Sequence, residues 1–148
     1  MRAVIQRVSK ASVKVDNQIV SEIDSGMVVL LGVKKGDTKE DAEILAKKTV
    51  NLRIFSDKED KMNLSLSDIS GKVIVVSQFT LYANCKKGRR PSFIEAALPE
   101  EADILYKYYI QKIENENIIV KTGIFQAMMQ VEIINEGPVT IVLDSDKL

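Results

Sequence analysis

The apolar run Met27–Val33 constrains the fold more than any other part of the sequence. It is the longest such run and only Gly32 interrupts it. A strand with one face in water alternates apolar and polar residues, whereas this run contains no polar residue. The run is short and rich in valine, which favours a strand covered on both faces. It is also far shorter than the about 20 residues that span a bilayer, so we expect a soluble protein without membrane contact.

Other segments also have the composition of strands, and a turn pair, Asp16-Asn17, separates two of them. They are Arg2–Val8, Ser12–Val15, Gln18–Ile23, Leu52–Phe55, Val73–Val76, Ile118–Thr122, Ala127–Ile134 and Val139–Leu143. Between Leu52–Phe55 and Val73–Val76, residues 57–62 form a charged loop. Only Asn135–Pro138 separates the last two strands, so we expect these two to form an antiparallel pair.

Two segments have helical spacing of apolar residues. The first begins at Asp37, which forms a capping-box-like pattern with Glu40, and its apolar positions are Ala42, Leu45, Ala46 and Thr49. The second begins near Pro99, and its stripe is Ala102, Leu105, Tyr106, Tyr109, Ile110 and Ile113. Residues 1–148 are therefore expected to form one α/β (α+β-like) domain. Its sheet is strand-rich, mostly antiparallel and barrel-like, with the two helices packed on it.

The absence of histidine excludes catalysis by a histidine base and metal binding by histidine. No Ser-His-Asp or Cys-His relay can form in the chain, nor can a histidine-ligated zinc or haem site. Cys85 is the only cysteine, which excludes an intramolecular disulfide and a cluster of thiolate ligands. We therefore expect no metal and no cofactor. The N-terminal segment lacks the pattern of a signal peptide, so a reduced, cytoplasmic location is expected.

The charge of the chain is balanced overall but unevenly distributed. Lysine and arginine number 21 and aspartate and glutamate 21, which argues against a general electrostatic affinity for nucleic acid. However, Lys86, Lys87, Arg89 and Arg90 follow one another without an acid, whereas residues 95–116 carry six acids and two lysines. These segments are either two solvated surfaces or a short basic loop that binds phosphate beside an acidic helix.

Two polar segments adjoin apolar strands. The first, Ser77–Leu81, either satisfies backbone groups at the end of its strand or forms a pocket there. In such a pocket Gln78 and backbone N–H groups would be donors to a developing oxyanion. The second, Asn135–Thr140, is either a plain hairpin loop or a stiff loop that selects a ligand by shape, because it holds both Gly137 and Pro138.

Taken together, these segments resemble the D-aminoacyl-tRNA deacylase family over essentially the whole chain. The matching motifs are Met1–Val8, Gly36-Asp37-Thr38, Leu52–Phe55, Ser77–Leu81, Lys87–Phe93 and Asn135–Thr140. The resemblance implies a homodimeric hydrolase that removes D-amino acids from tRNA, with Ser77, Gln78, Phe79 and Thr80 as catalytic residues. It also implies that the Gly137-Pro138 peptide is cis and enters the pocket of the partner protomer. There it would act as a chiral filter, supported by Met129, Asn135 and Thr140.

Such a filter rejects a side chain in the L position by collision, so it cannot exclude glycine, and Gly-tRNA is an expected second substrate. The chain departs from the family at Glu136, where aspartate is common, and at Gln126, where glycine is common. Glu136 keeps the charge and is expected to change little. Gln126 adds bulk near Phe125 and Met129, so we expect an effect on substrate preference rather than on the reaction.

Without histidine, two mechanisms for cleaving the ester remain. Thr80 would need a base to act as a nucleophile, whereas the 2′-OH of the terminal ribose can assist the attacking water. We favour the substrate-assisted route, with Lys86, Lys87, Arg89 and Arg90 holding phosphates of the acceptor stem. The alternatives are an editing domain that removes an L-amino acid, a non-catalytic tRNA-binding module and a structural β-protein.

Overall fold

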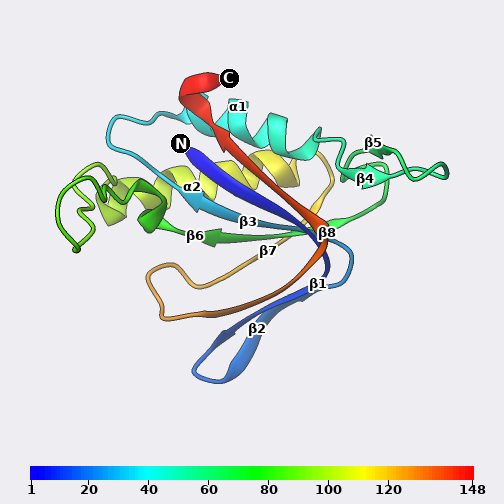
Figure 1. The fold of residues 1–148 in the computed structure, drawn as a ribbon, viewed down its shortest axis with the longest axis horizontal. Coiled ribbons are helices and arrows are strands. Elements are labelled where there is room, and N and C mark those ends of the chain that lie inside the picture. The colour runs from blue at the N-terminus through cyan, green and yellow to red at the C-terminus, as the bar shows by residue number, and fades with distance from the viewer.

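The computed structural model describes residues 1–148, and a curled six-stranded sheet forms its centre (Figure 1). Its strands run in the order β2-β1-β3-β6-β7, with β8 paired to the other edge of β1. Their bounds are β1 Arg2–Val15, β2 Gln18–Ile23, β3 Gly26–Gly32, β6 Lys72–Ser77, β7 Ile119–Thr122 and β8 Gln130–Asp144. A separate small hairpin is formed by β4, Phe55–Ser56, and β5, Met62–Leu64.

The apolar run lies where the sequence predicts, at the middle of the sheet. Strand β3 pairs antiparallel with β1 and parallel with β6, so both of its edges are occupied. Met27, Val29 and Leu31 point into one apolar cluster, and Val28 points into another on the opposite face. The prediction of a strand covered on both faces is confirmed. The sheet is mixed, since β1 makes antiparallel pairs with β2, β3 and β8 whereas β6 is parallel to β3 and β7.

Two helices, α1 Lys39–Val50 and α2 Pro99–Glu114, pack on one face of the sheet (Figure 1). Their buried residues come from the predicted stripes apart from Val50, which was not predicted, and the predicted Ala102 and Ile110 are only half-buried. The hydroxyl groups of Thr49 and Tyr109 join the helices through a buried 2.8 Å hydrogen bond. Helix α1 begins one residue later than the sequence suggests. Its N-cap is Thr38, whose backbone N–H donates to the Asp41 carboxylate at 2.8 Å.

The opposite face of the sheet folds over itself to form a partly open barrel. Strand β1 is long enough to pair with β3 in its first half and with β2 in its second half, while β8 follows it along the other edge. The enclosed cluster includes Val8, Val13, Ile74 and Val76. The strand-rich, barrel-like architecture with two packed helices is therefore confirmed.

The expectation of two C-terminal strands forming an antiparallel pair is wrong. Residues 130–144 form one strand, β8, which pairs with β1 at both ends. The register of the β1–β8 pairing shifts on both sides of Val8, because β8 has more residues there than β1. The segment Asn135–Pro138 is therefore an irregularity within one strand, not a hairpin loop. Likewise, Arg2–Val8 and Ser12–Val15 belong to one strand, and the predicted strand Leu52–Phe55 is reduced to Phe55–Ser56.

Candidate active site

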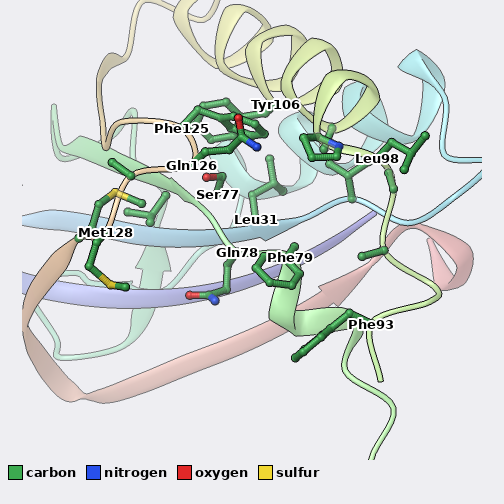
Figure 2. A pocket seen from close by; sticks show the side chains of 18 of the residues that line it. Leu31, Ser77, Gln78, Phe79, Phe93, Leu98, Tyr106, Phe125, Gln126 and Met128 are labelled. Atoms are coloured by element: carbon green, nitrogen blue, oxygen red, sulfur yellow. The ribbon is translucent and has the colours of Figure 1, made fainter. Parts of the chain in front are cut away.

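A cavity of about 780 Å³ opens at the carboxyl end of β6, below the first turn of α2 (Figure 2). Its walls come from the ends of β3 and β6, the segment that leads into α2, and the loop between β7 and β8. Most of the lining side chains are apolar, and the polar ones are Lys35, Ser77, Gln78 and Gln126. An apolar cleft with few convergent polar groups has the form of a small-molecule or cofactor site.

The parallel pairing of β3 and β6 places Ser77 and Gln78 in this cavity. The backbone N–H of Gln78 donates to the Leu31 carbonyl at 2.8 Å, which extends the pairing by one residue. The chain then turns into the short 3-10 helix η1, Phe79–Tyr82. The Gln78 side-chain amide donates to the Thr80 hydroxyl oxygen. Thr80 itself is exposed and is not among the residues that line the cavity.

The backbone N–H groups of Phe79 and Thr80 have no hydrogen-bond acceptor within the chain. They follow Ser77 and Gln78 directly, at the end of a strand whose other amides are paired in the sheet. Free and adjacent N–H donors beside a cavity are the groups that stabilise a negatively charged oxygen in acyl transfer. Two backbone N–H groups beside Gln78 are therefore without an acceptor, whereas the Gln78 amide already donates to the Thr80 hydroxyl.

Tyr106 forms part of the cavity wall from helix α2. Its hydroxyl donates to the Val75 carbonyl at 2.8 Å, and its ring lies 5.8 Å from that of Phe125. Burial raises the pKa of this phenol far above its ordinary value, and the nearby charge of Asp103 adds to the effect. Tyr106 is therefore a buried, hydrogen-bonded wall residue, and it belongs to the core as the helical stripe predicts.

The loop between β7 and β8 closes the cavity on the side of Phe125, Gln126, Met128 and Met129 (Figure 2). Gln126 has a φ of 63°, in the left-handed region that favours glycine. This conformation gives a physical reason for glycine to be common there in the family that the sequence resembles. In this chain the position instead adds an amide group to the cavity wall.

The second predicted group, Asn135, Gly137, Pro138 and Thr140, lies on β8 and does not line this cavity. The Asn135 amide donates to the Thr140 hydroxyl at 3.0 Å, and its oxygen accepts from the Val139 N–H at 3.1 Å. The Gly137-Pro138 peptide is cis, and both residues are exposed. The structure thus brings Ser77, Gln78, Phe79 and Met129 to one cavity and leaves the Gly-Pro segment outside it.

Arg7 holds the backbone around the Gly-Pro segment. Its Nε donates to the Glu136 carbonyl at 3.1 Å and its Nη1 to the Ile54 carbonyl at 2.6 Å. A β-carbon added at Gly137 would lie 2.8 Å from Arg7 Nη2, and the φ of Gly137 is +120°. The Arg7 guanidinium group therefore lies in space that a side chain at position 137 would need.

The basic loop lies beside the cavity mouth. Asn84 and Ser92 exchange two backbone hydrogen bonds, of 2.7 and 3.0 Å, which close the loop at its base. Lys86, Lys87, Arg89 and Arg90 are all exposed, and none of them takes part in an ion pair. Phe93, immediately after the loop, lines the cavity.

Asp37, Asp41 and Asp146 form the one group of acidic side chains close enough to hold a metal ion. Two cations of the chain offset part of its negative charge, because the Met1 α-ammonium lies 2.8 Å from Asp37 Oδ1 and Lys34 Nζ lies 2.5 Å from Asp146 Oδ2. The group lies outside the residues that line the cavity. None of the helices has the length and apolar character that crossing a membrane would require.

Several lining residues are not among the site residues predicted from the sequence. They include Leu31, Val33, Ala96, Ala97, Leu98, Pro99 and Ala102. Leu31 and Val33 belong to the apolar run and carry no local sign of a site. Only the parallel pairing of β3 with β6, which the sequence does not reveal, brings them beside Ser77.

Comparison with known proteins relates the whole chain to one family. The family model described as D-Tyr-tRNA(Tyr) deacylase matches residues 4–144. A D-aminoacyl-tRNA deacylase of Syntrophus aciditrophicus is 58% identical over 148 residues, covering 100% of this chain and 99% of that protein. One of Dehalococcoides mccartyi is 61% identical over 145 residues, with coverage of 98% and 95%.

Solved structures agree with this relationship. The structure titled "c-Myc DNA Unwinding Element Binding Protein" has a TM-score of 0.91 and 39% identity, over 97% of this chain and 98% of that one. A probable eukaryotic D-amino acid tRNA deacylase has a TM-score of 0.78 over 96% and 97% of the two chains. Since its identity is 18%, that second likeness concerns the fold alone.

Proposed function

The chain belongs to the D-Tyr-tRNA(Tyr) deacylase family, and from this membership we propose that it hydrolyses the ester bond of D-aminoacyl-tRNA. The products are free tRNA and the D-amino acid. The observation that carries the proposal is the match to named deacylases along the whole chain. The cavity supports it, because Ser77, Gln78 and Phe79 line it and the free N–H groups of Phe79 and Thr80 directly follow Gln78 in the chain. The cytoplasm, where charged tRNA is found, is the proposed location.

We propose that the acceptor end of the tRNA enters the cavity and that the ester lies against Ser77, Gln78, Phe79 and Thr80. The backbone N–H groups of Phe79 and Thr80 then stabilise the oxyanion of the tetrahedral intermediate. Met129 is a wall residue of this same cavity.

The proposed ligands for phosphates of the acceptor stem are Lys86, Lys87, Arg89 and Arg90. Glutamine replacements at these four positions are expected to weaken tRNA binding and to make it less dependent on salt concentration.

The 2′-OH of the terminal ribose is the proposed assistant of the attacking water. Thr80 is a poor nucleophile because its hydroxyl oxygen is engaged by the amide of Gln78, and an amide is not a base. No histidine exists in the chain to replace it. The protein contributes orientation and oxyanion stabilisation, and the substrate contributes the hydroxyl.

A single-turnover assay of D-Tyr-tRNA tests both the reaction and this mechanism. We expect the protein to cleave the ester, Thr80→Ala to retain much of the rate, and a 2′-deoxy terminal adenosine to be cleaved at least about a hundredfold more slowly. Trapping of an acyl group on Thr80 would contradict the mechanism. Binding of the tRNA without any cleavage would contradict the function.

We further propose that the protein is a homodimer in which Gly137 and Pro138 of one protomer enter the cavity of the other. Both residues are exposed and lie outside the cavity of their own chain, which supports a role in a second copy. Asn135 and Thr140 hold the segment, with Arg7 on its other side. The filter rejects L-esters by collision and accepts glycine, so Gly-tRNA is a proposed second substrate.

A non-catalytic nucleic-acid-binding module is the second candidate function. One observation favours it: the solved structure at 39% identity is titled as a DNA unwinding element binding protein. Removal of an L-amino acid by an editing domain is a further alternative, and matched D- and L-esters distinguish it from the proposed activity.

A further inference from the structure

Two phenylalanine rings lie exposed at the mouth of the cavity (Figure 2). Phe79 is 56% exposed and Phe93 37%, and their ring centroids are 5.0 Å apart at an interplanar angle of 67°. Phe79 lies just after β6 and Phe93 just after the basic loop, so the ring contact joins two segments on either side of that loop. An aromatic pair that stays in contact with both water and a cavity is suited to receive the flat face of a ligand.

The basic loop is fixed beside this aromatic pair. The two backbone hydrogen bonds between Asn84 and Ser92 close the loop one residue before Phe93. Its four cations are exposed and lack carboxylate partners, although residues 95–116 carry six acids. A ligand that combines flat rings with negative charges would match the pair and the loop at the same time.

We infer that Phe79 and Phe93 form a stacking surface for the base of the nucleotide that precedes the terminal one in the tRNA acceptor end. Single-stranded nucleic acid is bound in this way, by aromatic side chains that stack on bases beside cations that follow the backbone. The inference rests on the proposed function, since the ester must lie in the cavity for the preceding base to reach its mouth. It gives the exposed rings of Phe79 and Phe93 a role at the cavity mouth, whereas the ester is proposed to lie against the backbone N–H of Phe79.

The competing occupant of this surface is a second copy of the chain. Such a copy would cover the rings but offer no phosphate to the four cations of the adjacent loop. The charge of the loop therefore favours nucleic acid. Burial of Phe93 between copies would make the oligomeric state depend on Phe93, whereas stacking on a base would not.

Small ester substrates test the inference. The first is 3′-O-(D-tyrosyl)adenosine, the second carries the same ester on the dinucleotide CpA, and the third lacks the cytosine base. For the unaltered protein we expect kcat/KM to be roughly tenfold higher for the CpA ester than for the other two. Phe93→Leu keeps an apolar side chain without a ring face and is expected to abolish this advantage, whereas Phe93→Trp retains it. Ile94→Ser, at a 76% exposed position outside the cavity lining, is the matched control that keeps the advantage.

The possible results separate the inference from the proposed function. An equal advantage of the CpA ester in the unaltered protein and in Phe93→Leu would overturn the inference while leaving the deacylase activity established. Dissociation of an oligomer by Phe93→Leu, measured by sedimentation, would overturn it in favour of contact between copies. Failure of the unaltered protein to cleave any of the three esters and D-Tyr-tRNA would overturn both.

Discussion

At the scale of single residues, both the backbone conformation and the neighbours of Gly137 disfavour a side chain. Its φ of +120° lies in a region that side chains disfavour, and a β-carbon there would also approach Val139 Cγ2 to 2.9 Å. Arg7 Nη2, at 2.8 Å from that β-carbon, is the group that would have to move. Since the same guanidinium donates to the Glu136 carbonyl, a change at Gly137 would shift the backbone that we propose as the chiral filter.

Gly137→Ala is therefore expected to lower the ratio of kcat/KM for D-Tyr-tRNA over L-Tyr-tRNA. Gly36→Ala is the matched control, because Gly36 has a φ of +85° but no atom within 4 Å of an added β-carbon. Both replacements should lower the free energy of unfolding by about 1 kcal/mol through backbone strain. Only Gly137→Ala should change the D to L ratio, and equal ratios in the two variants would refute the role of Gly137.

Two buried tyrosines differ in their hydrogen bonding, so replacing each by phenylalanine should affect stability differently. The Tyr82 hydroxyl is buried without a hydrogen-bond partner, whereas the Tyr109 hydroxyl bonds to Thr49 at 2.8 Å. Tyr82→Phe should leave the free energy of unfolding unchanged or raise it, because it removes an unsatisfied polar group. Tyr109→Phe should lower it by about 1 kcal/mol. Denaturant unfolding measures both, and a larger loss for Tyr82→Phe than for Tyr109→Phe would contradict the hydrogen-bond assignment.

The residues of the candidate site were predictable only where local sequence carries the signal. Polar residues directly after an apolar strand identified Ser77 and Gln78, which do line the cavity. Thr80 belongs to the same motif, but the turn into η1 directs it out of the cavity lining. Leu98 and Ala102 could not be found this way, because an apolar wall residue and an apolar core residue have the same local pattern.

At the scale of secondary structure elements, the pairing of β1 with β8 organises the molecule. It runs from Arg2 opposite Asp144 to Lys14 opposite Gln130. At one end, Arg2 Nη2 lies 2.8 Å from Asp144 Oδ2, and Arg2 Nη1 donates to the Leu81 carbonyl at 2.9 Å. This side chain therefore connects the sheet edge to η1, which contains the candidate site residues Phe79 and Thr80.

The Arg2–Asp144 pair predicts a dependence of stability on pH. Burial raises the pKa of Asp144, but hydrogen bonds from Arg2 and the Asp146 N–H outweigh it, so the pKa lies below its ordinary value. The pair stabilises the fold above about pH 4, where the unfolded carboxyl is ionised, and this contribution is lost as the pH falls through the lower folded pKa. Asp144→Asn should be less stable at pH 7 and should lose less stability on acidification below pH 4. The free energy of unfolding of both proteins is measured from pH 7 to pH 2. An equal loss of unfolding free energy in the two proteins over this range would contradict the prediction.

The sequence predicts a helix or strand correctly where neighbouring residues determine it, and less well where a distant partner does. Helix α2 follows from its apolar stripe, and β3 follows from a short, valine-rich apolar run that favours a strand covered on both faces. Strand β8 was predicted wrongly because Gly137-Pro138 has the composition of a turn. Its pairing with β1 on both sides of the segment keeps the strand continuous, and that partner lies more than a hundred residues away in sequence.

At the scale of the whole molecule, the cavity and the Gly-Pro segment lie apart in one chain. Val142, which pairs with Val4 on β1, is 62% exposed, and Ile134 on the same strand is 50% exposed. The strand that carries Gly137 and Pro138 thus presents apolar side chains to the outside. A second copy that covers this strand would both bury them and bring the segment to a cavity.

Mixed dimers test this arrangement. Gln78→Ala should impair its own cavity but leave Gly137 intact, whereas Gly137→Ala leaves its own cavity intact. If the segment acts across the dimer, an excess of Gln78→Ala should restore the D to L ratio of the Gly137→Ala protein, because the working cavity then faces an unaltered Gly137. The dimers are refolded from a mixture of the two variants. If the D to L ratio of kcat/KM does not recover in them, the segment acts on the cavity of its own chain.

The most direct test of the whole account is the rate of ester hydrolysis for matched D-Tyr-, L-Tyr- and Gly-tRNA. A site that selects by collision at the backbone, without histidine chemistry, should cleave D-Tyr-tRNA and Gly-tRNA and leave L-Tyr-tRNA intact over the same period. Rapid release of L-tyrosine would contradict the account, because it would show that the Gly137-Pro138 segment does not exclude an L side chain.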